Sequence, residues 1–300
     1  MQCLPPARWY WCCLYALCAA NLVNADNRVV VSATADASYT EKKYGEGKTK
    51  RETYVVMKGH YFAGTTIDGS IDKMTFRGIL DYLAPKLALQ QFLPAQKGES
   101  PDLLLVIHWG TTAPKTSSLE MMARTSAVTD TSNSVTTISQ QLREATGTTT
   151  PFDALGSESD LVARFDQLEQ LTEEMGAESA RANIAQLLGY TKTLRTLQHD
   201  INPGETERTL KFDMAHERYF IIVKAYDLHV STRGRSARAI WTLHLNMSSA
   251  GNNFRMAMAE MSAVSVDYVG RSSIDVQTVR PKQREGHVDI GEAIIVGEQK

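Results

Sequence analysis

The stretch PDLLLVIHWGTT, residues 101–112, decides how the rest of the chain is interpreted. Because side chains alternate across a strand, one face of this segment carries four apolar residues and the other carries two before it reaches a histidine: Leu103, Leu105, Ile107 and Trp109 against Leu104, Val106 and His108. A strand that is apolar on both faces is typical of the centre of a covered sheet. The sequence therefore predicts an α/β protein, with α+β as the alternative.

Segments on both sides of this strand supply the rest of a single sheet flanked by helices. Further strands are predicted at 28–37, 52–64, 217–228, 238–247 and, as an edge strand, 288–300. Apolar spacing predicts a helix from Met74 onward to Phe92, with a cap at Ser70 or Asp72. It also predicts an antiparallel hairpin of two helices, over 157–175 and 179–199. A last helix is predicted over 253–270, where Met256, Met258 and Met261 are interpreted as core residues. Pro85 predicts a kink or break in the first helix.

The first twenty-five residues have the pattern of a cleaved export signal. Arg8 precedes an apolar run from Trp9 to Ala20, and Val23-Asn24-Ala25 provides a cleavage site after Ala25. The run is short for a membrane-spanning helix, so a retained anchor is the weaker alternative. A lipid anchor is disfavoured because Leu17, not a small residue, precedes Cys18. Residues 26–300 are then predicted to form one periplasmic or secreted domain without a transmembrane span.

Composition narrows the classes of partner and chemistry. All four cysteines lie within residues 1–25, so the mature chain has no disulfide and no thiol nucleophile. The net charge of the whole chain is −2, and no basic patch points to a nucleic acid. The basic run at 42–51 is interpreted as a solvated loop. Residues 115–156 are rich in Ser and Thr and, together with the helical hairpin 157–200, are read as an insertion in the domain.

Sequence motifs for common activities are incomplete. GEGKT at 45–49 lacks the first glycine of a phosphate-binding loop, and His216-Glu217 lacks the second histidine of a zinc protease. His229 and His244 fall on opposite arms of a predicted hairpin, about 13 Å out of register for a shared metal. The chain contains no Gly-x-Ser-x-Gly elbow. No catalytic residues, metal ligands or cofactor are therefore predicted.

The end of the central strand is the best candidate binding site in the sequence. His108, Thr111 and Thr112 are expected to line a pocket there, with Trp109 as its wall, because open α/β sheets bind ligands at strand ends. The competing interpretation is a packed imidazole that is hydrogen-bonded to a neighbour.

The order of helix 74–94, strand 101–110, hairpin and closing helix resembles an uncharacterised family of exported bacterial envelope proteins, many of them small lipoproteins. Asp102 in the central strand, and Asp227 and Trp241 in the hairpin, carry the resemblance. It implies an α/β sandwich and an envelope location, and it brings no catalytic residues.

Three functions follow as hypotheses. The first is an exported envelope protein with a non-enzymatic binding or assembly role, whose partner is an envelope component or a small molecule. The second is an exported hydrolase or small-molecule-binding protein that uses the strand end at His108. The third is a scaffold that docks through the helical hairpin 157–200.

Overall fold

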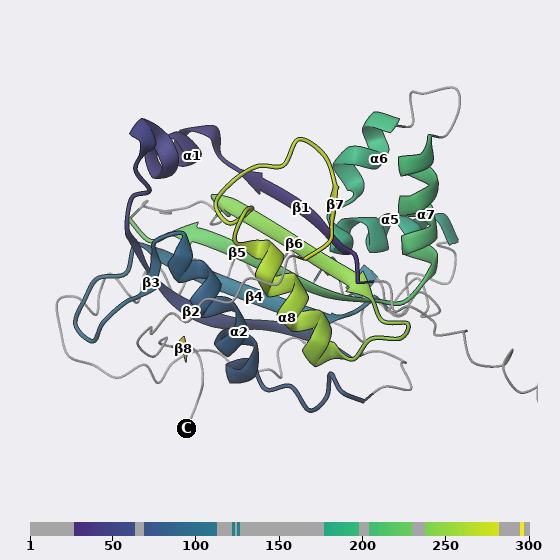
Figure 1. Cartoon of the computed structure of the whole chain (residues 1–300), viewed down its shortest axis with the longest axis horizontal. Helices are drawn as coiled ribbons and strands as arrows, with labels where there is room; N and C mark the ends of the chain where they lie inside the picture. Colours follow the sequence, from purple (N-terminus) through teal and green to yellow (C-terminus); the bar gives the residue numbers. More distant parts are fainter. Residues whose placement is uncertain are drawn as a thin grey trace, which may run out of the picture.

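One mixed β-sheet forms the centre of the protein (Figure 1). The structure, a computed structural model, describes residues 27–63, 69–112, 122–123, 125–126, 177–197, 204–229, 238–281 and 295–296. The strand order is β3-β2-β4-β5-β6-β1-β7, and β8 also pairs with β2. The strands are β1 (Val29–Ala35), β2 (Glu52–Phe62), β3 (Phe92–Pro94), β4 (Leu103–Thr111), β5 (Arg218–Asp227), β6 (Trp241–Ser248), β7 (Gln277–Val279) and β8 (Ile295–Val296). The predicted α/β class is confirmed.

The central position of β4 is also confirmed. All nine of its residues are buried, and it pairs in parallel with β2 on one side and antiparallel with β5 on the other. Strands β5 and β6 form the predicted antiparallel pair, and β1 and β7 extend the sheet beyond β6. Only the pairs of β2 with β3, β4 and β8 are parallel in the described sheet.

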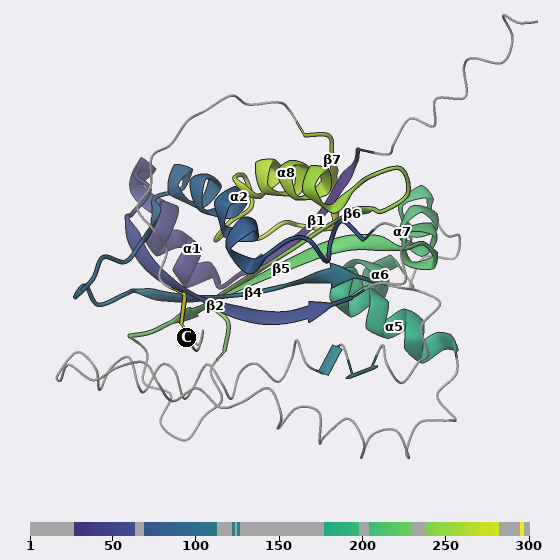
Figure 2. The same cartoon turned by 90° about the horizontal axis from the view of Figure 1, so that it is seen from below.

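Helices lie on both faces of the sheet (Figure 2). They are α1 (Ala37–Tyr44), α2 (Phe76–Leu89), α5 (Ala177–Leu188), α6 (Thr191–Leu197), α7 (Glu205–Ala215) and α8 (Phe254–Ser265), with a short 3-10 turn η1 (Gly45–Gly47). Helices α2 and α8 pack on the face that carries Leu103, Leu105, Ile107 and Trp109. Helices α5 and α7 pack on the opposite face against Phe220 and Ile222 of β5.

Helix α2 departs from its prediction at both Pro85 and its cap. The helix continues through Pro85, so of the predicted kink or break the break is wrong and the kink stays a prediction. The carbonyl group that loses its donor belongs to Asp81, which is exposed, so water can bond to it. Thr75 caps the helix, with its hydroxyl accepting a hydrogen bond from the Gly78 amide at 3.1 Å. Ser70 instead accepts from the amide of Phe254, the first residue of α8.

The basic run at 42–51 is more than a solvated loop, because its first part belongs to α1. The Lys43 side chain is fully buried, with Nζ 3.6 Å from a Glu52 carboxylate oxygen and 3.8 Å from the centre of the Phe92 ring. Phe92 lies in β3 and not at the end of α2 as predicted. Burial of the ammonium group lowers the pKa of Lys43 to about 8.

Other predictions hold in part. The predicted helix 179–199 is two helices, because the chain turns at Gly189, which has φ +77°. Helix α7 is an element that the sequence analysis did not predict. In α8, Met258 and Met261 are fully buried as expected, but Met256 is 50% exposed. The tail contributes β8. The signal segment 1–25, helix 157–175 and nearly all of 115–156 lie outside the described residues.

Candidate functional site

The four residues predicted to form a pocket at the end of β4 are all buried, and they do not line one cavity. His108 and Trp109 face opposite sides of the sheet, as alternation requires. Trp109 is 3% exposed and stacks on Phe76 of α2 with 5.6 Å between ring centres. The tryptophan is therefore part of the core beneath α2 and not a wall beside His108.

His108 is held in a neutral form inside the protein. The His60 amide donates a hydrogen bond to His108 Nδ1 at 3.0 Å, so the ring proton is on Nε2. Burial, and then the charge of Lys224, hold the pKa of His108 well below its usual value. Gly59 leaves room for the ring, since a Cβ there would lie 2.7 Å from Nδ1. Gly59 lies within the register shift of β2 between Lys58 and Tyr61.

Thr112 lies beside a buried polar cluster that links β5, β6 and α7. The Thr112 hydroxyl accepts a hydrogen bond from the Arg218 amide at 3.1 Å. Arg218 pairs with Asp213 at 2.7 Å and donates to Asn246 at 2.6 Å. The Tyr190 hydroxyl lies 2.8 Å from the same Asn246 oxygen. These residues are at least 96% buried, so the cluster fixes α7 and the α5–α6 corner to the sheet rather than facing solvent.

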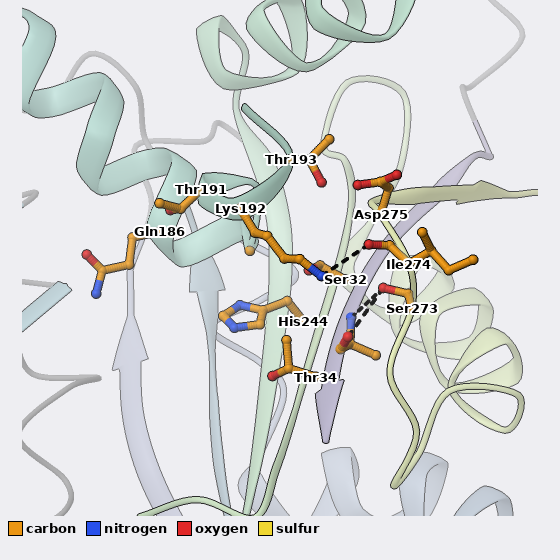
Figure 3. A pocket seen from close by; sticks show the side chains of 12 residues that line it. Ser32, Thr34, Gln186, Thr191, Lys192, Thr193, His244, Ser273, Ile274 and Asp275 are labelled. Carbon is orange, nitrogen blue, oxygen red and sulfur yellow. Dashed lines mark hydrogen bonds between the residues drawn. The ribbon is translucent and has the colours of Figure 1, made fainter. Parts of the chain in front are cut away.

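A cavity of about 190 Å³ lies between β1, β6, the α5–α6 corner and residues 273–275 (Figure 3). Its lining is rich in hydroxyl groups and has one histidine. The lining residues are Ser32, Ala33, Thr34, Gln186, Gly189, Thr191, Lys192, Thr193, His244, Ser273, Ile274 and Asp275. This cavity is the candidate functional site.

The floor of the cavity is built by a cross-strand pair. Ser32 of β1 and His244 of β6 are register partners, so their side chains leave the sheet on the same face. Gly189, at the α5–α6 corner, packs directly against them: a Cβ there would lie 2.8 Å from Ser32 Cβ and 2.9 Å from His244 Cγ. Its positive φ of +77° lets the chain turn here without a side chain.

The orientation of the His244 ring is fixed by the end of α5. Its Nδ1 lies 2.9 Å from the Leu187 carbonyl oxygen, which can only accept, so Nδ1 carries the proton. Burial, despite that hydrogen bond, lowers the pKa of His244 to about 4, and Lys224 contributes in the same direction. At neutral pH the ring is therefore uncharged and its Nε2 is a hydrogen-bond acceptor.

The outer wall joins α6 to the segment 272–276. Lys192 Nζ donates to the Ile274 carbonyl at 3.3 Å, and the Val276 amide donates to the Thr193 hydroxyl at 3.2 Å. On the sheet side, the Ser273 hydroxyl accepts from the Ala33 amide at 3.1 Å, so the segment continues the edge of β1 beyond β7. These bonds hold the two sides of the cavity mouth together.

The residues of the sequence resemblance have structural partners. Asp102 accepts from the Thr53 amide at 2.8 Å and lies 3.1 Å from His229 Nε2. Asp227 accepts from the His229 amide at 2.7 Å, and Trp241 packs in the core. Both carboxylates lie at the same end of the β4–β5 pair, where Leu103 is the register partner of Asp227. Within the described ranges, no three or more His, Cys, Asp or Glu side chains are grouped in a way that could hold a metal ion.

Substitution of Gly189 by Ala is expected to lower the free energy of unfolding by about 2–3 kcal/mol, from the left-handed conformation and from overlap with the floor pair. Urea denaturation measures the change. Gly204→Ala is the matched control, because a Cβ at Gly204 meets nothing within 4 Å and its φ is −66°. Equal effects of the two substitutions would contradict the packing described for Gly189.

Comparison of the chain with protein-family models, curated proteins and solved structures gives no match. The function is therefore inferred from the geometry of the cavity and from the sequence patterns.

Proposed function

We propose that the protein is an exported component of the cell envelope that binds a small molecule, without a chemical step, in the cavity above Ser32 and His244. The observation that carries the proposal is this cavity, which is floored by a fixed neutral histidine and lined by hydroxyl groups. A few placed polar groups in a concave site are the usual means by which proteins orient small ligands.

Binding suits His244 better than catalysis. A general base works best when its pKa is near the operating pH, whereas the pKa of His244 is about 4. Its proton-bearing Nδ1 is bonded to a backbone carbonyl, which fixes the ring in one orientation. A fixed, uncharged acceptor is suited to recognition. The interior positions of His108, Trp109, Thr111 and Thr112 lend no support to the hydrolase alternative at the end of β4.

Ligand binding is tested by thermal unfolding of residues 26–300 with small metabolites of every charge class. We expect at least one compound to raise the midpoint temperature of the natural sequence but not that of Ser32→Leu, whose larger side chain fills the floor of the cavity. Thr206→Val, on the exposed first turn of α7, is the control and should respond like the natural sequence. A compound that stabilises Ser32→Leu equally would place binding elsewhere. Failure of every compound to stabilise the natural sequence would contradict the proposal.

The envelope location is supported by the pattern of the first twenty-five residues and by the resemblance carried by Asp102, Asp227 and Trp241. In the part of the chain that the structure describes, no helix is long and apolar enough to cross a membrane.

Cleavage is expected to leave Asp26 as the N-terminal residue of the protein in its native host. Mass spectrometry of the intact protein from the envelope fraction checks this and also detects a lipid or a retained leader. Substitution of Ala25 by a bulky residue such as Tyr should block processing, since the peptidase requires a small residue at that position. Recovery of the full-length chain from the cytosol would contradict export.

A further inference from the structure

We infer that the ligand of this cavity is a neutral, polyhydroxylated molecule of about the size of a single sugar ring. The inference rests on the proposed binding function and adds the chemical class of the ligand. Three features of the cavity carry it: the distribution of charge, the hydrogen-bonding groups of the floor, and the volume.

Charge is absent from the floor of the cavity and balanced at its mouth. Ser32, Thr191 and His244 are half-buried, and all three are uncharged at neutral pH. The charged lining residues are Lys192 and Asp275, which are exposed and of opposite sign. Charges in contact with water contribute little to binding energy. Lys224, whose charge acts on His244, is not among the lining residues, so an ion seated on the floor would lose its hydration without touching a buried counter-charge.

The floor offers hydrogen-bonding groups that a ligand hydroxyl can satisfy. In the described part of the chain, His244 Nε2 and the hydroxyls of Ser32 and Thr191 have no hydrogen-bond partner; the Thr191 oxygen is closed off from solvent, so it reaches a ligand after rotation of its side chain. A neutral imidazole nitrogen needs a donor, whereas Ser and Thr hydroxyls can donate or accept. An alcohol does both at one oxygen, so adjacent alcohols on one ligand can bond to His244 and to these hydroxyls together (Figure 3).

Anions and cations fit the same groups less well. The Nε2 lone pair of His244 repels an anion, and Lys192 is already bonded to the Ile274 carbonyl at 3.3 Å. A cation could bond to Nε2, but the lining carboxylate, that of Asp275, is exposed and lies in the segment 273–275 rather than among the strand residues of the floor. A zwitterion would meet both difficulties.

The volume sets the size of the ligand. A cavity of about 190 Å³ has room for a compact molecule of several non-hydrogen atoms. That space suits one small ring, and any further units of a longer molecule would lie outside the cavity.

The test is titration calorimetry of residues 26–300 with D-glucose and myo-inositol as neutral probes and with glycine and inorganic phosphate as charged ones. At least one neutral probe should bind with a Kd of about 10 mM or tighter. Thr191→Val removes one hydroxyl at constant shape and should raise that Kd by about 5–10-fold. His244→Gln keeps an acceptor and should retain binding, whereas His244→Phe should raise the Kd at least tenfold. Thr206→Val, the same chemical change on exposed α7, should have no effect.

The outcomes separate the ligand class from the proposed function. Binding of phosphate or glycine that His244→Phe abolishes, with no binding of a neutral probe, would overturn the neutral class and leave the cavity as a binding site. Neutral probes that bind equally to Thr191→Val and His244→Phe would overturn the site. If His244→Phe does not fold, Thr191→Val, which disturbs no hydrogen bond within the described chain, decides alone. Absence of binding by both neutral probes at about 10 mM overturns the inference.

Discussion

Substitution of Asp213 by Ala is expected to lower the free energy of unfolding by about 3–5 kcal/mol, because it leaves the Arg218 charge buried without its carboxylate partner. The two side chains are 2.7 Å apart and only 5% and 4% exposed, respectively. Arg218 would keep its 2.6 Å bond to Asn246, but its side chain is too deeply buried for water to replace the carboxylate. Urea denaturation with a linear extrapolation measures the loss.

Two controls isolate the cost of the unpaired charge. The double substitution Asp213→Ala with Arg218→Met removes both charges and should be less destabilising than Asp213→Ala alone, since a buried pair can often be replaced by apolar residues at little cost. Asp36→Ala breaks the Asp36–Arg238 pair, which has the same 2.7 Å separation but lies at the surface, and should cost about 1 kcal/mol or less. A similar loss in Asp36→Ala and Asp213→Ala would show that burial does not set the energy.

The buried cluster also bears on the cavity. Tyr190, whose hydroxyl lies 2.8 Å from Asn246, directly follows Gly189 and precedes Thr191 in the chain. Its burial anchors the corner that places both cavity residues. A protein that is loosened at Asp213 should therefore lose ligand affinity as well as stability, although Asp213 does not line the cavity.

The sequence predicted the centre of the sheet because the pattern there is local. Nine buried residues with apolar side chains on both faces identify β4 from one short segment, and alternation assigns His108 and Trp109 to opposite faces. The sequence could not predict α7 in the same way, since its buried positions include Glu207 and Asp213 along with Leu210 and Met214. A helix that buries carboxylates lacks a clear apolar stripe.

The cavity was hidden from sequence analysis for a different reason. Ser32, Gly189 and His244 are more than fifty residues apart in the chain, and they meet only because β1 pairs with β6 and α5 ends above both. His244 alone in an apolar strand indicates nothing about a ligand. The one local signal was Gly189, a glycine inside a helical stretch, which can mark a position where the backbone turns or approaches closely.

Acidification from neutral pH is expected to destabilise the protein by about 3 kcal/mol through His244 alone by pH 4, with His108 adding to the loss. The pKa of His244 is about 4 when folded against 6.5 for an ordinary histidine, and that of His108 is also well below its usual value. Both pKa values are depressed, so the unfolded chain takes up protons first and stability falls as the pH drops below 6.5. Each histidine costs about 1.4 kcal/mol per pH unit in this window.

The charged groups near the two histidines do not add to the pH dependence of stability in this range. Burial lowers the pKa of Lys224, which faces both histidines, to about 8, so Lys224 stays protonated throughout. The pKa of Asp102 is lowered from 3.8, so its effect begins below the window. Urea denaturation between pH 7 and about pH 4.5 measures the slope, which His244→Gln and His108→Gln should each reduce. His216→Gln, at an exposed position on the surface, is the matched control and should keep it. A slope unchanged in both buried-histidine variants would show that these rings are not held neutral by the fold.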